Sequence, residues 1–174
     1  MEDTRKAQEI LEPLKKALRL EHEGKKFFKE AAERCEGQLP RQTFQFLADE
    51  EDKHIEHIEQ FYKSLVDSED AAPPSVDDAA TDDRFKELLG TFDELKSAIK
   101  PTASDMEAYQ TALQFENGAE EYYAEQAAKT DKPHIREFYE WLIREEERHA
   151  RLLESCVKFV EDPAGWFKQG SGDD

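Results

Sequence analysis

The strongest constraint in this sequence is a pattern that occurs twice, at an offset of 95 residues, the separation of Glu21 from Glu116. In each copy a glutamate is followed 30 residues later by a second glutamate, which has a histidine three residues after it. Aromatic positions repeat at the same offset, so that Phe28 aligns with Tyr123. A duplication of this kind predicts a fold built from two similar halves. The residues of the two copies are Glu21, Glu51 and His54, and Glu116, Glu146 and His149.

Each half is predicted to be a helical hairpin. Apolar residues recur at helical spacing in four segments, the first of them running to Cys35. Pro13 suits the first turn of a helix, because its missing N–H would be unpaired there, and a short preceding helix over residues 1–12 is left open. Ser104 and Glu107 have the spacing of a capping box at the start of the third segment. The predicted helices cover about 13–35, 38–67, 104–129 and 133–160.

A long connection separates the two hairpins. Residues 67–83 are rich in acids, proline and small side chains, which predicts an exposed linker. Residues of about 84–99 are predicted to form a shorter amphipathic helix, which ends before Pro101. The predicted fold class is all-α, as a single domain over 1–174. Its parts are hairpin 1 at about 13–67, the linker and short helix at 68–104, hairpin 2 at about 105–161 and a tail at 162–174.

The six repeated residues are predicted to face the core of a bundle. Glu21 lies on the apolar stripe of its helix, and the other five interrupt their stripes in the same way. Glu50 and Glu145 are each followed three residues later by a basic residue and are predicted to lie off the stripe. Because burying an unpaired carboxylate is unfavourable, four of them close together need counter-charge or protonation. Two divalent cations would supply that charge, and a glutamate and histidine at i and i+3 can both reach one ion.

With these residues the sequence resembles the ferritin-like superfamily, and within it the rubrerythrin-related proteins. The resemblance rests on LRLEHEGKKFF (18–28), FLADEEDKH (46–54), LQFENGAEEYY (113–123) and WLIREEERH (141–149). It implies a ferritin-like four-helix bundle with a site for two iron ions, manganese being the main competitor. By resemblance, the terminal ligands are Glu21 and Glu116, the bridging ligands are Glu51 and Glu146, and the ligands that each bind one metal are His54 and His149.

The sequence departs from rubrerythrin at several positions. Full rubrerythrin carries a rubredoxin domain with paired Cys-x-x-Cys ligands, whereas this chain has two cysteines, so a separate donor would supply electrons. An extra family glutamate on the third helix is replaced here by Ala119; the adjacent Glu120 is predicted to face solvent, with a role as alternate ligand left open. Tyr123 has the position of a family tyrosine that hydrogen-bonds at the site, core packing being the other interpretation. The small side chains at Gly24 and Ala119 have two interpretations. They could leave room for an oxidant over the metals, or they could allow the helices to pack closely.

Charge and cysteine content narrow the function classes. The 174 residues carry a net charge of −18, from 42 Asp and Glu against 24 Lys and Arg. A field of this sign repels the phosphates of nucleic acids, and no apolar run is long enough for a membrane span, so neither partner is predicted. Cys35 and Cys156 lie far apart, which argues against a disulfide framework and favours the reducing cytoplasm.

Three functions remain open from the sequence. The first is a redox enzyme that reduces peroxide or O₂ at a di-iron site, with electrons from an external donor protein. The second is iron oxidation and storage, which needs a closed shell of many subunits, and the third is a non-enzymatic metal-binding bundle. The resemblance favours the first, and it implies a homodimer or a higher homo-oligomer.

Overall fold

The computed structural model describes residues 2–94 and 102–168, and its regular elements in that part are helices. The short helices are α3 (Asp78–Glu94) in the crossover and α6 (Pro163–Lys168) near the C-terminal end. None of the helices in these ranges is both long and apolar enough to cross a membrane. The predicted all-α fold is confirmed. The four long helices are α1 (Glu2–Arg34), α2 (Gln38–Asp67), α4 (Ala103–Lys129) and α5 (Pro133–Glu161).

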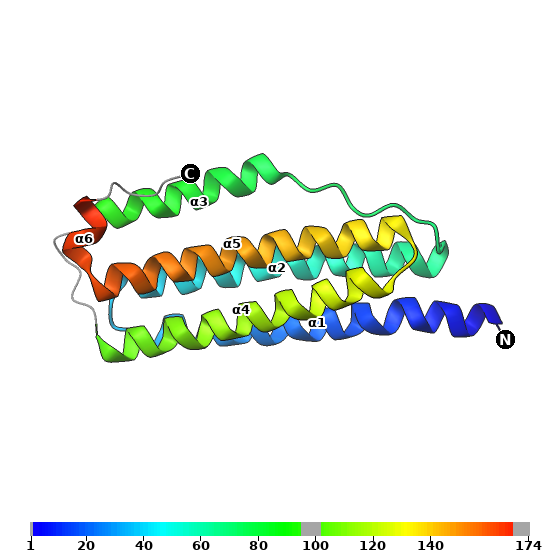
Figure 1. Cartoon of the computed structure of the whole chain (residues 1–174), viewed down its shortest axis with the longest axis horizontal. Helices are drawn as coiled ribbons and strands as arrows, with labels where there is room; N and C mark the ends of the chain where they lie inside the picture. The colour runs from blue at the N-terminus through cyan, green and yellow to red at the C-terminus, as the bar shows by residue number, and fades with distance from the viewer. Residues whose placement is uncertain (1, 95–101, 169–174) are drawn as a thin grey trace.

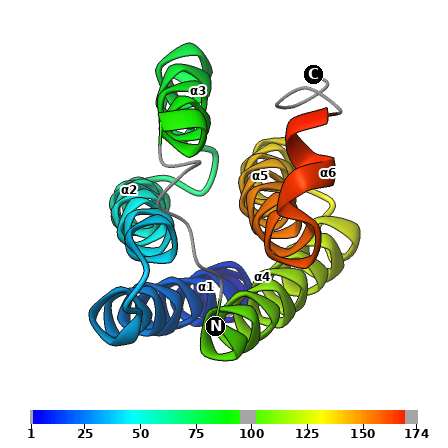
Figure 2. The ribbon, with the colours of Figure 1, turned by 90° about the vertical axis from the view of Figure 1, so that its left-hand side faces the viewer.

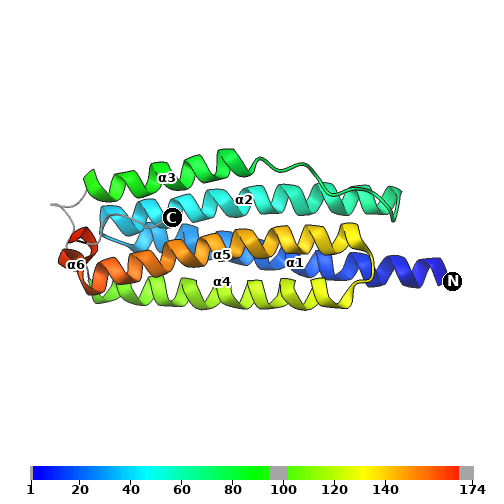
Figure 3. The same ribbon diagram turned by 45° about the horizontal axis from the view of Figure 1, so that its top comes forward.

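The long helices form two antiparallel hairpins, α1 with α2 and α4 with α5 (Figure 1). Seen along the bundle, α1 lies beside α4, while α2 and α5 form the other pair (Figure 2). α3 runs back along the outside of the bundle next to α2 (Figure 3). Two hairpins joined by one long crossover make the ferritin-like topology.

Two apolar clusters fill the interior of the bundle. One lies toward the α1–α2 turn and includes the stacked rings of Phe28 and Phe44, whose centroids are 6.2 Å apart. The other lies toward the α4–α5 turn and includes Leu14 and Phe61. Full burial of side chains of this size contributes about 1.5–3 kcal/mol each. The clusters therefore hold the four helices in the register that aligns the polar residues between them.

Pro13 lies inside α1, and the prediction that the helix begins there is wrong. A proline in a helix interior costs about 3 kcal/mol, because it lacks an N–H and its ring meets the preceding turn. Ile10 and Leu11 pack against the second apolar cluster. On the other side of the proline, the Tyr122 hydroxyl donates to the Pro13 carbonyl at 2.9 Å. These tertiary contacts keep α1 helical through the proline.

α4 begins with a capping box two residues before the predicted one. The Thr102 hydroxyl accepts a hydrogen bond from the Asp105 N–H at 3.1 Å, and the Asp105 carboxylate accepts one from the Thr102 N–H at 3.4 Å. Ser104 and Glu107 have the same sequence spacing, but they already lie within the helix. The two possible capping boxes have the same spacing, so the sequence alone does not distinguish them. The observed box is the one whose acidic residue, Asp105, is buried.

α3 begins at Asp78, earlier than the predicted start at about 84. The Asp77 carboxylate accepts a hydrogen bond from the Ala80 N–H at 3.0 Å, which is the contact of an N-cap residue. Acidic side chains are also favoured at a helix start by the helix dipole. Part of the segment predicted to be linker is therefore helical. The predicted end of this helix, at about 99, lies outside the described residues.

Candidate metal centre

The six residues of the repeat meet in the middle of the bundle, and each is at most 1% exposed. Their ligand atoms form two overlapping groups, within each of which the atoms lie within 4.8 Å of one another. Glu51 and Glu146 belong to both groups, as bridging carboxylates between two metals would. The groups are Glu21, Glu51, His54 and Glu146, and Glu51, Glu116, Glu146 and His149.

The two histidines face the carboxylates through the same ring atom. His54 Nδ1 lies 2.9 Å from Glu21 Oε2. His149 Nδ1 lies 3.2 Å from Glu116 Oε1 and 3.2 Å from Glu51 Oε1. The two imidazole rings stack with centroids 5.1 Å apart and an angle of 12° between their planes. Nδ1 is therefore the atom through which each histidine would bind a metal.

Several atoms of this cluster are buried without a hydrogen-bond partner among the described residues. Buried polar atoms normally have partners, and an unsatisfied one costs about 1–3 kcal/mol. Carboxylate oxygens and imidazole nitrogens are ligands that iron and manganese accept. The donor set therefore fits divalent cations of this class. The unpartnered carboxylate oxygens are Glu51 Oε1, Glu116 Oε2 and both oxygens of Glu146.

The carboxylates of the cluster differ in how readily they ionise. Burial and the charges of neighbouring carboxylates raise the pKa values of Glu51 and Glu146 well above the ordinary 4.5. Burial raises the pKa of Glu116 to about 7. Burial acts in the same direction on Glu21, but the charge and hydrogen bond of His54 lower its pKa to about 2. At neutral pH the cluster retains protons that bound cations would displace.

The two histidines also differ. Burial lowers the pKa of His149, which favours the neutral imidazole that binds metals. Burial has the same effect on His54, but the charge of Glu21 and hydrogen bonds to carboxylates raise its pKa well above the ordinary value. In the metal-free protein a protonated His54 is the internal counter-ion of the cluster. Metal binding beside Glu21 would release that proton.

Tyr123 reaches the cluster, but it contacts the opposite hairpin. Its hydroxyl donates to Glu21 Oε1 of α1, although Glu116 is the cluster residue on its own helix. The repeat partner of Tyr123 is Phe28, which has no hydroxyl. Only one half of the site therefore has a tyrosine that holds a carboxylate.

Tyr123→Phe is expected to destabilise the metal-free protein by about 1.5–3 kcal/mol, the usual contribution of a hydrogen bond to a charged group. Tyr139→Phe is the matched control, because the buried Tyr139 hydroxyl has no partner among the described residues. The two rings lie 6.2 Å apart, so both variants change the same region of the core. Denaturant unfolding of the two variants measures the difference, and equal stabilities would contradict the assigned hydrogen bond.

Gly24 packs against the site and leaves no open space. A Cβ atom there would lie 2.8 Å from the Phe115 ring and 3.0 Å from Glu51 Oε2. The space next to Gly24 is thus filled by protein atoms. Helix-packing clearance explains this glycine better than room for an oxidant does.

Gly24→Ala is expected to destabilise the protein by about 1–3 kcal/mol, the usual cost of overpacking, and to weaken metal binding because Glu51 must move. Gly118→Ala is the control, since a Cβ at Gly118 meets nothing within 4 Å. Alanine is also the better helix former by about 1 kcal/mol, so this second variant should be more stable than the parent. Thermal unfolding with and without Mn(II) separates the two effects. A Gly24→Ala protein as stable as Gly118→Ala would refute the packing argument.

The prediction that Glu50 and Glu145 lie off the apolar stripe is wrong. They are 1% and 3% exposed. Arg84 donates to Glu50 at 2.9 Å and Arg148 to Glu145 at 2.8 Å. Burial alone would raise the pKa of both carboxyls. Arg84 lowers the pKa of Glu50 below the ordinary value, and His54 and Arg148 lower that of Glu145. The signal in the sequence was their recurrence at the same 95-residue offset, since 145 is the repeat partner of 50.

Other residues of metal-binding types lie away from this centre. Glu120 is partly buried and belongs to neither ligand group. His57 Nδ1 lies 2.7 Å from the Lys53 carbonyl oxygen on its own helix. Cys35 and Cys156 are free and buried. None of these four residues brings a further ligand to the cluster.

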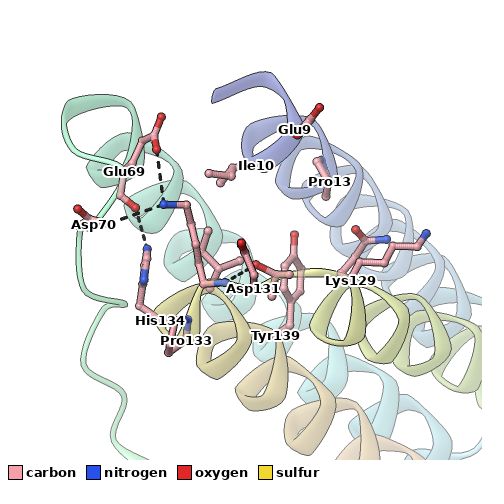
Figure 4. A pocket seen from close by; sticks show the side chains of 14 residues that line it. Glu9, Ile10, Pro13, Glu69, Asp70, Lys129, Asp131, Pro133, His134 and Tyr139 are labelled. Atoms are coloured by element: carbon pink, nitrogen blue, oxygen red, sulfur yellow. Dashed lines mark hydrogen bonds and ion pairs between the residues drawn. The ribbon is translucent and has the colours of Figure 1, made fainter. Parts of the chain in front are cut away.

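A separate cavity of about 490 Å³ lies at the α4–α5 turn (Figure 4). Part of its polar lining is already paired: Lys132 Nζ lies 3.5 Å from Glu69 Oε2, and His134 Nε2 lies 2.7 Å from the Glu69 carbonyl oxygen. None of the six repeat residues lines the cavity. The candidate metal centre is thus enclosed in the bundle and distinct from this surface cavity.

Comparison with known proteins agrees with this geometry. A family model described as a ferritin-like domain matches residues 10–159. No curated protein and no solved structure gives a significant match. The matched range covers most of the chain and includes all six residues of the repeat. The chain therefore belongs to the ferritin-like domain family.

Proposed function

We propose that this protein is a di-iron carboxylate oxidoreductase of the rubrerythrin-like type, which reduces peroxide or O₂. The observation that carries the proposal is the pair of overlapping ligand groups that share Glu51 and Glu146. Iron bound there would supply a Lewis acid and the electrons for reduction of the oxidant. Manganese is the main competitor for the same ligands.

The residues of the chain would hold the metals and exclude water. Glu21 and Glu116 would be terminal ligands, and His54 and His149 would bind through Nδ1. The Tyr123 hydroxyl would keep Glu21 in place, as its hydrogen bond suggests. The two apolar clusters lie on either side of the six polar residues and keep bulk water out. The exclusion of water strengthens the electrostatic interactions inside.

Electrons would come from a separate donor protein. Cys35 and Cys156 are buried, and they lie too far apart in the sequence to form a Cys-x-x-Cys motif. Reduction of one peroxide would consume two electrons, so turnover would need a reductant that docks from outside.

Anaerobic loading with Fe(II), metal analysis and then addition of peroxide test the proposal. We expect two iron ions per chain and consumption of one peroxide for every two Fe(II) oxidised, because each peroxide accepts two electrons. Loading well below two metals per chain would refute the site. Sedimentation as a large shell, with iron uptake far beyond two per chain, would instead establish storage. A protein that gains neither metal nor stability from Fe(II) would be a structural bundle.

A further inference from the structure

α3 lies outside the four-helix bundle, yet its side chains reach the level of the metal centre. The ring of Phe85 packs edge-on against Phe46 of α2, with centroids 4.8 Å apart. It also lies 6.2 Å from the imidazole of His149 on α5. Leu88 is buried in the first apolar cluster. α3 is thus seated on the bundle and contacts both helices that carry the Glu-x-x-His pairs.

Arg84 of α3 holds Glu50 at two points. Its Nε lies 2.9 Å from Glu50 Oε1 and its Nη2 lies 3.3 Å from Oε2. Two-point contacts between arginine and a carboxylate fix the orientation of the carboxylate as well as balancing its charge. Lys53 Nζ of α2 also donates to Glu50 Oε1, at 2.6 Å. The ion pair of Arg84 thus fixes α3 next to Phe85, whose ring lies beside His149.

A second contact from α3 reaches the other histidine. Asp82 Oδ1 lies 3.1 Å from Arg148 Nη2, and Arg148 Nη1 lies 2.8 Å from Glu145 Oε1. The other oxygen of Glu145 lies 3.7 Å from His54 Nε2, on the side of the ring away from the candidate metals. A carboxylate behind a metal-binding histidine sets the orientation and basicity of the ring.

We propose that α3 positions the two histidines of the metal centre from outside the bundle. Arg84, through its ion pair with Glu50, holds Phe85 beside His149, and Asp82 acts on His54 through Arg148 and Glu145. The inference rests on the metal-binding role proposed above. Glu50 and Glu145 are repeat partners, as are His54 and His149. The crossover helix α3 lies outside the repeat, and it contacts both halves.

Cobalt(II) titration tests this proposal without turnover, since the visible spectrum of the bound ion reports the ligand geometry. Arg84→Gln is expected to weaken cobalt binding about tenfold, which is the usual effect of substituting residues that orient metal ligands. It is also expected to shift the spectrum. Arg84→Lys should restore most of the affinity because it keeps the charge. Lys86→Gln, on the exposed side of α3, removes the same charge and should change neither the affinity nor the spectrum.

The second contact has its own matched pair of variants. Asp82→Asn is expected to act like Arg84→Gln, while Asp83→Asn, at an exposed position of the same helix, should act like the parent. If the parent binds two cobalt ions and both test variants match it in affinity and spectrum, the positioning role is wrong and the metal site stands. Equal losses in the test and control variants would also overturn it, in favour of a bulk charge effect. A parent that binds no cobalt would overturn the site itself.

Discussion

Glu51→Gln is expected to abolish metal binding at both positions of the centre. Glu51 belongs to both ligand groups, and glutamine keeps the shape of the side chain while removing its charge. The loss of affinity should exceed the roughly tenfold to hundredfold loss that follows substitution of residues that only orient metal ligands. Isothermal titration with Mn(II) measures it, since this ion fits the same ligands.

His149→Ala distinguishes the shared ligands from the terminal ones. His149 belongs to one group only, so this variant should retain about one of two metals while Glu51→Gln retains none. Glu120→Ala is the negative control, because Glu120 belongs to neither group. Two metals bound by Glu51→Gln would refute the bridging role, and a metal lost from Glu120→Ala would show that Glu120 is a ligand.

The metal-free protein is expected to lose stability as the pH rises above 4.5. Burial and neighbouring charges raise the folded-state pKa values of Glu51 and Glu146 well above that value. The folded chain then keeps protons that the unfolded chain has lost, so unfolding becomes easier with rising pH. Each such proton contributes about 1.4 kcal/mol per pH unit. The raised pKa of His54 acts in the same direction as its proton is lost.

Among the six residues of the repeat, two act in the opposite direction. The lowered pKa of Glu21, at about 2, adds stability that is complete once the pH exceeds 4.5, so it does not change the slope above that value. The lowered pKa of His149 adds stability as the pH rises toward 6.5 and none beyond it. It is one group against Glu51, Glu116, Glu146 and His54, whose pKa values are raised. The net slope is therefore negative.

Thermal unfolding across this pH range, with chelator and with Mn(II), measures the effect. Divalent metal should reverse the slope, because it binds the deprotonated ligands and competes less with protons at higher pH. Metal at a hundred times its dissociation constant adds about 2.7 kcal/mol per site. Glu51→Gln should flatten the metal-free slope, since it removes one of the titrating carboxyls. A metal-free midpoint that rises with pH would contradict the buried cluster.

The repeat predicted which residues meet, because helical spacing places Glu51 and His54 on one side of their helix and the duplication sets the level of their partners. It did not predict the position of Glu50, which is buried. Periodicity considers only the apolar stripe of a residue's own helix. Glu50 pairs with Lys53 of α2 and also with Arg84, which comes from α3. The continuation of α1 through Pro13 was missed for the same reason, since packing of the flanking turns outweighs local propensity.

The sequence by itself determined the helical hairpins, the crossover between them and the set of six polar residues on the inner faces, because these depend on spacing along one helix and on a fixed repeat. Only the tertiary structure decided what surrounds those residues. Tyr123 holds Glu21 of the opposite hairpin, and Arg84 of the crossover holds Glu50. Contacts of this kind join residues far apart in the chain, and they depend on how helices dock, which no local pattern encodes.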